Sequence, residues 1–428
     1  MTQPNNRQSS IPNDFDVTPE APAVRTQSPS TARVPYVLRR LCQRLSACDA
    51  GTLTVRLDDG REGRVAGSQA GHEAEIHLHR PWRALLRLLT RGEIGFAEGY
   101  IAGDWSTPHL GRVLGWAIDN EQAVDQLAQR PLWQRTLDRL RHSLRRNSIA
   151  GSRANIRFHY DLGNDFYRTW LDPSMTYSSA WFTRGDESLE VAQTAKYERL
   201  LDALDAEPGA HILEIGCGWG GFAEVAARRG FRVTGITLSD AQLEYAQARI
   251  QQAGLADRVS LEKLDYRHLP RHAAAPFDHV VSIEMFEAVG ERWWSTYFDV
   301  VRRALKPGGR VALQVITIEE EAFERYRCSA DFIQLYVFPG GMLPPASRLL
   351  ELGQQNGLKT LSQDFFGQDY ARTLAEWHDR VEDADTSLRG LGYDDRFLRM
   401  WRYYLRYCEI GFLAKRIDVT HTIFERGA

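Results

Sequence analysis

Apolar strands alternate with helical segments between residues 197 and 317, and this alternation limits the possible folds more than any other feature. The runs HILEIGC, FRVTGITL, FDHVVSIE and GRVALQVITI are nearly continuous in apolar residues, which is typical of strands buried on both faces. Helical patterns separate these runs. The sequence therefore predicts an α/β fold in which helices cover both faces of a parallel sheet.

The turn after the first of these strands carries an acid and a row of glycines. Its sequence is EIGCGWGG, which begins at Glu214 and has glycines at Gly216, Gly218 and Gly220. Such glycines let a ligand approach the backbone amides at a strand-to-helix turn. Nicotinamide enzymes use a related turn. However, the preceding acid and the G-x-G-x-G spacing resemble the S-adenosylmethionine (SAM) loop of class I methyltransferases.

This resemblance implies further cofactor contacts after the next two strands. Thr237 stands where an acid usually holds the ribose, so Asp240 or Gln242 would supply those contacts instead. The other contacts implied by the resemblance are Leu238 after the second strand, and Asp265 and Tyr266 after the third.

Longer motifs resemble the cyclopropane-fatty-acyl-phospholipid synthase family, which includes mycolic acid cyclopropane synthases and fatty-acid methyl- or methylene-transferases. These motifs are NIRFHYDLGNDFYRTWLDPSMTYSSAWF (155–182), SIEMFEAVG, FIQLYVFPGGMLPP (332–345) and RYYLRYCEIGF (402–412). The resemblance covers residues 155–428. It implies a class I SAM-dependent methyltransferase with a Rossmann-like sheet and helical insertions.

The family's activity implies that this chain adds a one-carbon unit to unsaturated acyl chains of membrane phospholipids and forms cyclopropane rings. Methyl transfer to an alkene leaves a carbocation, which aromatic faces stabilise without trapping it. Tyr177 and Tyr336 are the aromatic candidates within the motifs. A small-molecule methyltransferase and a lipid-binding protein that has lost its activity are the alternatives from other classes.

In the resembled family, a bicarbonate ion removes the proton that allows the ring to close, and Cys, Glu, His and Tyr groups hold that ion. Glu287, Tyr336 and Cys408 match the family's Glu, Tyr and Cys. The alternative for Cys408 is a buried apolar thiol. The resemblance thus implies SAM and bicarbonate as cofactors.

Three positions depart from the family's pattern. Ser179 replaces a cysteine in the motif YSSA, in which Tyr177 and Ser178 are predicted cofactor contacts. Gln314 stands where a histidine usually contacts bicarbonate, and Ala288 replaces another histidine. Glutamine donates a hydrogen bond to an anion but does not shuttle a proton. The alternative product is therefore a methylene or methyl branch, formed after a hydride shift without ring closure.

The composition changes along the chain predict four segments. They are a disordered tail over 1–32, an α+β domain resembling the lipid-binding extra domain of phospholipid-acting members over 33–125, a basic amphipathic linker over 126–154, and the catalytic domain over 155–428. The linker's apolar stripe and arginines suit either a lipid headgroup layer or packing against a neighbouring domain. Within the α+β domain, PWRALLRLLTRG predicts a helix that begins at Pro81 and stops at Gly92.

The overall composition excludes some partners. The net charge of -3 argues against nucleic acid. No apolar run reaches the roughly 20 residues that span a bilayer, and the start of the chain lacks the layout of a secretory signal. The five cysteines contain no C-x-x-C pair, and we predict no metal site. We expect a cytoplasmic protein at the inner face of the membrane, with an anionic lipid surface as its partner. A homodimer is one assembly that the sequence leaves open.

Overall fold

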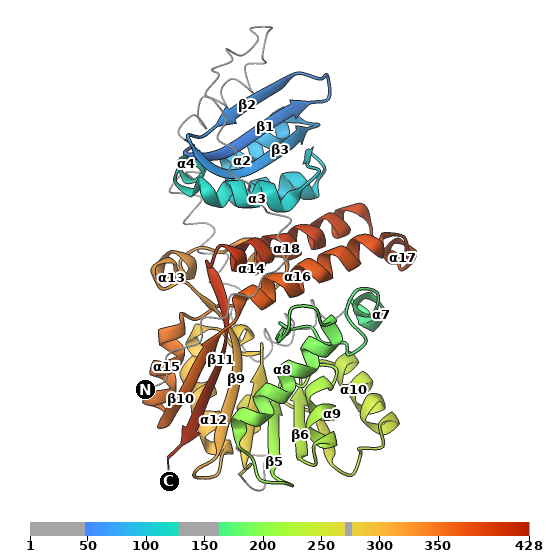
Figure 1. The fold of residues 1–428 in the computed structure, drawn as a ribbon, viewed down its shortest axis with the longest axis vertical. Helices are drawn as coiled ribbons and strands as arrows, with labels where there is room; N and C mark the ends of the chain where they lie inside the picture. Colours follow the sequence, from blue (N-terminus) through green and yellow to red (C-terminus); the bar gives the residue numbers. More distant parts are fainter. Residues whose placement is uncertain (1–47, 128–161, 270–275, 428) are drawn as a thin grey trace.

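The computed structural model describes residues 48–127, 162–269 and 276–427. A seven-stranded sheet forms the lower part of the molecule in Figure 1, in the order β10-β11-β9-β8-β5-β6-β7. The strands are β5 (His211–Ile215), β6 (Arg232–Thr237), β7 (Val259–Lys263), β8 (His279–Ile283), β9 (Arg310–Ile318), β10 (Leu358–Phe365) and β11 (Ile417–Arg426). Strands β5 to β9 are parallel, whereas β11 runs antiparallel to both β9 and β10. The predicted parallel sheet is confirmed.

Neighbouring residues of each central strand enter two different cores, because side chains alternate across a sheet. Ile212 of β5 packs with Leu200 and Phe222, whereas Leu213 packs with Trp294 and Tyr297. The helices that supply the first core are α8 (Leu189–Leu204) and α9 (Gly221–Arg228), with α10 (Asp240–Gln252) beside β7. Helices α12 (Trp294–Ala304) and α15 (Ala346–Gln355) supply the second.

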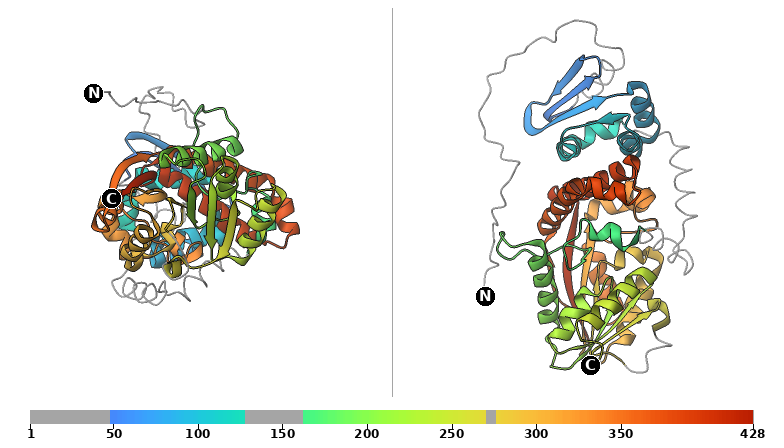
Figure 2. Two further views of the ribbon diagram at one scale, coloured as in Figure 1. Left: turned by 90° about the horizontal axis from the view of Figure 1, so that it is seen from below. Right: turned by 90° about the vertical axis from the view of Figure 1, so that its right-hand side faces the viewer.

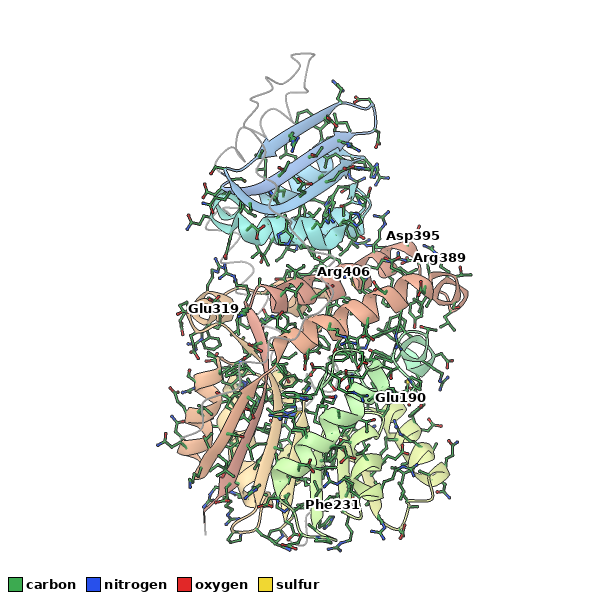
Figure 3. The ribbon with its side chains drawn as sticks, viewed as in Figure 1. Glu190, Phe231, Glu319, Arg389, Asp395 and Arg406 are labelled. Atoms are coloured by element: carbon green, nitrogen blue, oxygen red, sulfur yellow. The ribbon has the colours of Figure 1, made fainter. Side chains whose placement is uncertain are left out.

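A helical layer covers the end of the sheet that faces the N-terminal domain (Figures 1 and 2). Its main helices are α16 (Gly367–Asp383) and α18 (Asp395–Leu413), which pack against each other, and α17 (Asp385–Gly390) joins them. Arg389 of α17 pairs with Asp395 at 2.5 Å and fixes this turn (Figure 3). The shorter helices α7 (Gly163–Arg168), α13 (Glu320–Arg327) and α14 (Phe332–Tyr336) lie around the same layer.

The N-terminal domain is a four-stranded sheet in the order β2-β1-β3-β4, with helices packed on it. Its strands are β1 (Ala50–Leu57), β2 (Glu62–Ala66), β3 (Gln69–Leu78) and β4 (Trp105–Ser106). Its helices are α2 (Pro81–Ile101), α3 (Leu110–Asp119) and α4 (Glu121–Leu127). The helix predicted from Pro81 is confirmed, and so is its predicted stop at Gly92. Gly92 adopts φ 57° and ψ -135°, which ends the first helical segment, and a second segment that was not predicted continues α2 to Ile101.

Helix α18 joins the two domains by packing against α2 and α3. Arg399 of α18 donates to the carbonyl oxygen of Tyr100 at 3.3 Å. Arg325 of α13 pairs with Glu121 at 2.8 Å. The N-terminal domain therefore sits directly above the helical layer (Figure 1).

The predicted tail over 1–32 and linker over 126–154 lie outside the described residues, apart from residues 126 and 127. The disorder predicted for the tail, the amphipathic helix predicted for the linker and the ends of both segments therefore stay predictions. Among the residues that the structure describes, no helix is both long and apolar enough to cross a membrane.

Candidate active site

One continuous cavity of about 690 Å³ links the sheet to the interior of the N-terminal domain. At one end it is lined by Gly216, which follows β5, and by Thr237, the last residue of β6. At the other end it is lined by Leu53, Ile76 and Trp105 of the N-terminal domain. Strand β5 lies between β6 and β8, so strand order reverses beside it. Ligands of open α/β sheets bind at such a switch point.

The glycine turn after β5 leaves space against its backbone. Gly216 has φ 91°, and a Cβ atom there would lie 2.9 Å from the Met285 side chain. Gly218 has φ 49°, and a Cβ atom there would meet nothing within 4 Å. Both glycines line the cavity, whereas Gly220 is the N-cap of α9, where a Cβ atom would lie 3.1 Å from the Ala246 side chain. The first two glycines therefore form the cradle, and the third positions the helix.

Glu214 presents an unsatisfied acceptor to this cavity. The residue is 3% exposed, and its Oε2 atom has no hydrogen-bond partner. Burial raises the pKa of Glu214 to about 8, and nearby Arg249 acts in the opposite direction. A buried carboxyl oxygen without a donor suits a ligand that brings an ammonium group, as the methionine part of SAM does. The residues present thus fit this cofactor.

The predicted nucleoside contacts divide into two groups. Thr237, Leu238, Gln242 and Tyr266 line the cavity, and the Tyr266 hydroxyl has no partner. Asp265 does not line it, and both of its carboxyl oxygens accept from the Arg267 side chain, at 2.9 and 2.6 Å.

Tyr177 and Ser178 also line the cavity. The Tyr177 hydroxyl lies 2.8 Å from that of Tyr404, and its ring packs against Trp377 with the centroids 5.2 Å apart. The Ser178 hydroxyl accepts a bond of 2.5 Å from the ammonium group of Lys196, which is fully buried. Burial lowers the pKa of Lys196, while Glu284 and Asp172 act to raise it. 

The structure gathers two predicted catalytic residues around a carboxylate that the sequence did not single out. Glu284 accepts from the Ser179 amide at 2.8 Å, from Gln314 Nε2 at 2.7 Å and from the Tyr370 hydroxyl at 2.6 Å. Its φ of 48° is unusual for a residue with a side chain. Such backbone strain is often found at functional sites. Ser179 contributes through its main chain, since its hydroxyl donates to Ala180.

The electrostatics of Glu284 reflect burial opposed by donors. Burial raises its pKa, whereas the Tyr370 hydroxyl and the charge of Lys196 act to lower it. His421 orients the Gln314 amide, because Nε2 of His421 lies 2.8 Å from Oε1 of Gln314. Burial lowers the pKa of His421 far below its usual value. A neutral His421 therefore donates to Gln314, which turns the amide donor toward Glu284.

Glu287 lines the same cavity in a different environment. Its Oε1 accepts from the Ile316 amide at 2.6 Å, and its Oε2 has no partner. Burial, together with the charge of Glu284, raises the pKa of Glu287 to about 8. Glu287 is thus mostly protonated at neutral pH.

Cys408 and Tyr336 are not among the three donors to Glu284. Cys408 lines the cavity, and burial raises the pKa of its thiol, so it stays neutral and is a poor nucleophile. The Tyr336 hydroxyl donates to Glu98 of the N-terminal domain, and Tyr336 does not line the cavity. The structure therefore does not bring Tyr336 to Glu287, and the tyrosine hydroxyl at the cluster belongs to Tyr370.

The described residues contain no group of His, Cys, Asp and Glu side chains that could hold a metal ion. The sequence analysis did not predict a role for three residues of the site, namely Glu284, Tyr370 and His421. Glu284 follows directly after β8, at the carboxyl end of a parallel strand where ligands bind, and this position was the available signal.

The sheet order, the glycine cradle and the buried acid at the end of β5 define a class I SAM-dependent methyltransferase. The family model for mycolic acid cyclopropane synthetase matches residues 147–422. The chain belongs to this family, whose members use SAM.

Relatives and solved structures agree with this assignment. The chain is 37% identical to the tuberculostearic acid methyltransferase of Mycobacterium tuberculosis, over 94% of this chain and 96% of that protein. It is 35% identical to the cyclopropane-fatty-acyl-phospholipid synthase of Escherichia coli, over 83% and 88% respectively. A crystal structure of a mycolic acid cyclopropane synthase complexed with SAH and CTAB superposes with a TM-score of 0.59 at 30% identity, covering 64% of this chain and 98% of that one. The protein is thus a SAM-dependent enzyme that modifies unsaturated acyl chains.

Proposed function

We propose that the protein transfers a methyl group to the double bond of an unsaturated acyl chain of a membrane phospholipid, and that Glu284 accepts the proton lost afterwards. SAM, when bound, supplies an electrophilic methyl group. The observation that carries the proposal is the Glu284 carboxylate, which borders the cavity and is fixed by three donors.

The cavity walls suit the cation that methyl addition creates on the acyl chain. Tyr177, Phe338 and Tyr404 line them, and the faces of aromatic rings attract positive charge. The neutral thiol of Cys408 does not trap the cation. An apolar wall also keeps water from capturing it.

Glu284 is better suited than Glu287 to remove the proton. Its donors oppose the rise in pKa that burial causes, and they fix the direction of both oxygens. Glu287 has a raised pKa of about 8 and holds its own proton at neutral pH. Glu284 also accepts from the donors that a small oxyanion would need. We therefore propose that this carboxylate takes the place of bicarbonate.

Two products can follow from the cation. If the proton leaves the new methyl group as a bond forms to the cationic carbon, a cyclopropane ring results. If a hydride shifts first, loss of the same proton gives a methylene branch. We place the methylene branch first, because a relative named as a methyltransferase aligns with 94% of this chain. Ring closure is the second candidate, favoured by the resemblance to the E. coli synthase.

We propose that the N-terminal domain, predicted over 33–125, holds part of the lipid. Leu53, Ile76 and Leu114 line the far end of the cavity, inside this domain. An apolar space continuous with the catalytic end suits the remaining length of an acyl chain or a second chain.

Incubation of the protein with SAM and vesicles tests the proposed function. Vesicles of a phosphatidylglycerol with one cis-unsaturated chain should yield SAH and a lipid with one more carbon in equal amounts, and fully saturated vesicles should yield neither. Mild hydrogenation should then add two hydrogen atoms to a methylene product but none to a cyclopropane. SAH release without any change in the lipid would contradict the proposal.

A further inference from the structure

The first half of α2, residues 81–91, carries large apolar side chains of which none is buried. They are Trp82, Leu85, Leu86, Leu88 and Leu89. Trp82 is 66% exposed and Leu86 is 63% exposed, the highest values for large apolar side chains among the described residues. A helix of a globular protein normally buries its apolar stripe. Within the part of the chain that the structure describes, nothing covers Trp82 and Leu86.

Residues three or four apart lie on one side of a helix, so this segment has three stripes. Trp82 and Leu86 form the exposed apolar stripe, which we name the docking stripe. The stripe that lines the cavity contains Pro81, Ala84, Leu85 and Leu88. The basic stripe contains Arg80, Arg83, Arg87 and Arg91. The same helix thus faces the substrate cavity on one side and solvent on another.

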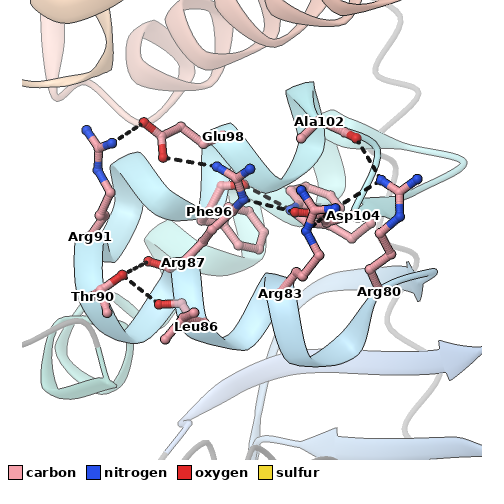
Figure 4. Close-up of polar contacts among 11 residues, drawn as sticks. Arg80, Arg83, Leu86, Arg87, Thr90, Arg91, Phe96, Glu98, Ala102 and Asp104 are labelled. Carbon is pink, nitrogen blue, oxygen red and sulfur yellow. Dashed lines mark hydrogen bonds and ion pairs between the residues drawn. The ribbon is translucent and has the colours of Figure 1, made fainter.

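The arginines of the basic stripe are held in place by two buried acids (Figure 4). Asp104 is fully buried and pairs with Arg80 at 3.3 Å, Arg83 at 3.5 Å and Arg87 at 2.9 Å. Glu98 pairs with Arg91 at 2.8 Å and with Arg87 at 3.4 Å. Four guanidinium groups around two carboxylates leave an excess of positive charge.

The arginine side chains remain open to solvent despite these contacts. Their exposed fractions are 52% for Arg80, 59% for Arg83, 30% for Arg87 and 43% for Arg91. Each guanidinium carries five N–H donors, more than one or two carboxylate contacts use. Donors held in a fixed fork suit phosphate oxygens. An anionic partner therefore complements this surface.

Charge argues against two other occupants of the docking stripe. In a symmetric dimer, the docking stripe of one copy would contact the docking stripe of the other. This contact would bring the two basic stripes close together, and their like charges would repel. Residues 130–157 are themselves rich in arginine, so they would also add like charge. A lipid surface supplies both an apolar layer and phosphates.

We propose that the docking stripe binds the surface of an anionic phospholipid bilayer. Trp82 and Leu86 enter the boundary between headgroups and acyl chains, where tryptophan is favoured. The basic stripe contacts lipid phosphates. This inference rests on the proposed function, since it places the bilayer against the helix whose other side lines the acyl-chain cavity.

Sedimentation with vesicles tests the docking stripe in the full chain. The variant Trp82→Ser/Leu86→Ser should bind phosphatidylglycerol vesicles at least about tenfold more weakly, because it no longer buries two apolar side chains in the lipid layer. Its turnover of vesicle lipid should fall in parallel. Its SAM affinity and its turnover of a monomeric short-chain unsaturated phospholipid should stay unchanged. The matched control is Phe365→Ser/Leu391→Ser, which removes two exposed apolar side chains elsewhere and should bind as the parent does.

Other outcomes separate this inference from the proposed function. Vesicle binding that is unchanged in Trp82→Ser/Leu86→Ser would overturn the inference, as would a dimer of the parent protein that this variant alone converts to a monomer. Arg83→Gln should lower the preference for anionic over neutral vesicles, and an unchanged preference would contradict the role of the basic stripe. If the parent binds vesicles through the stripe but modifies no lipid in any form, the proposed function fails while the docking surface stands.

Discussion

Replacing Glu284 by glutamine is expected to lower product formation at least about a hundredfold, the usual size of a general-base contribution. Glutamine keeps the shape of the side chain and still accepts hydrogen bonds, but it does not take up a proton. The loss should appear in kcat. Titration calorimetry should show a Kd for SAM within about threefold of the parent, because Glu214 and the glycine cradle are untouched.

Two comparisons make this prediction specific. Tyr370→Phe removes one of the three donors to Glu284 and should cost about tenfold, in keeping with the loss of one hydrogen bond to a charged group. Glu287→Gln should cost less than Glu284→Gln, since Glu287 already holds a proton at neutral pH. Turnover of Glu284→Gln within threefold of the parent would show that another group accepts the proton.

Replacing Gly218 by aspartate is expected to abolish SAM binding, with Kd raised more than about a hundredfold. The new side chain would enter the space that lies open beside this residue, and its negative charge would lie in the same cavity as Glu214. The fold should tolerate the change, because a Cβ atom there meets nothing within 4 Å. The positive φ costs about 1–2 kcal/mol of stability.

Gly209→Asp is the matched control for this variant. Gly209 also has a positive φ, of 82°, and a Cβ atom there also meets nothing within 4 Å, but it does not line the cavity. Both variants should therefore lose similar stability in thermal unfolding, and only Gly218→Asp should lose the cofactor. Normal SAM affinity in Gly218→Asp would place the cofactor elsewhere.

The fold was predictable where local patterns and tertiary packing agree. The buried strands of the sheet are nearly continuous in apolar residues, and the turn after β5 needs glycines at positive φ. Gly92 ends the first segment of α2 as predicted, but the second segment, up to Ile101, was not predicted. Tertiary contacts decide that case: Ile94 and Ala97, which follow the break, are buried.

The cofactor end of the site was more predictable than the catalytic cluster. Glu214 and its glycines are adjacent in sequence, whereas Glu284 receives its donors from residues 30 to 105 positions away. No local pattern reports such contacts. Tyr336 shows the same limit, since it lies in a family motif and yet its hydroxyl donates to Glu98. Its predicted catalytic role stays a prediction that the geometry does not favour.

The most direct test of the account is the fate of a deuterated methyl group. The protein would be incubated with SAM carrying a trideuterated methyl group and with unsaturated phosphatidylglycerol vesicles, and the acyl chains would be analysed by mass spectrometry. The added carbon should retain two of its three deuterium atoms, because Glu284 accepts the third as a deuteron. An added carbon that retains all three, or acyl chains that gain no label, would contradict it.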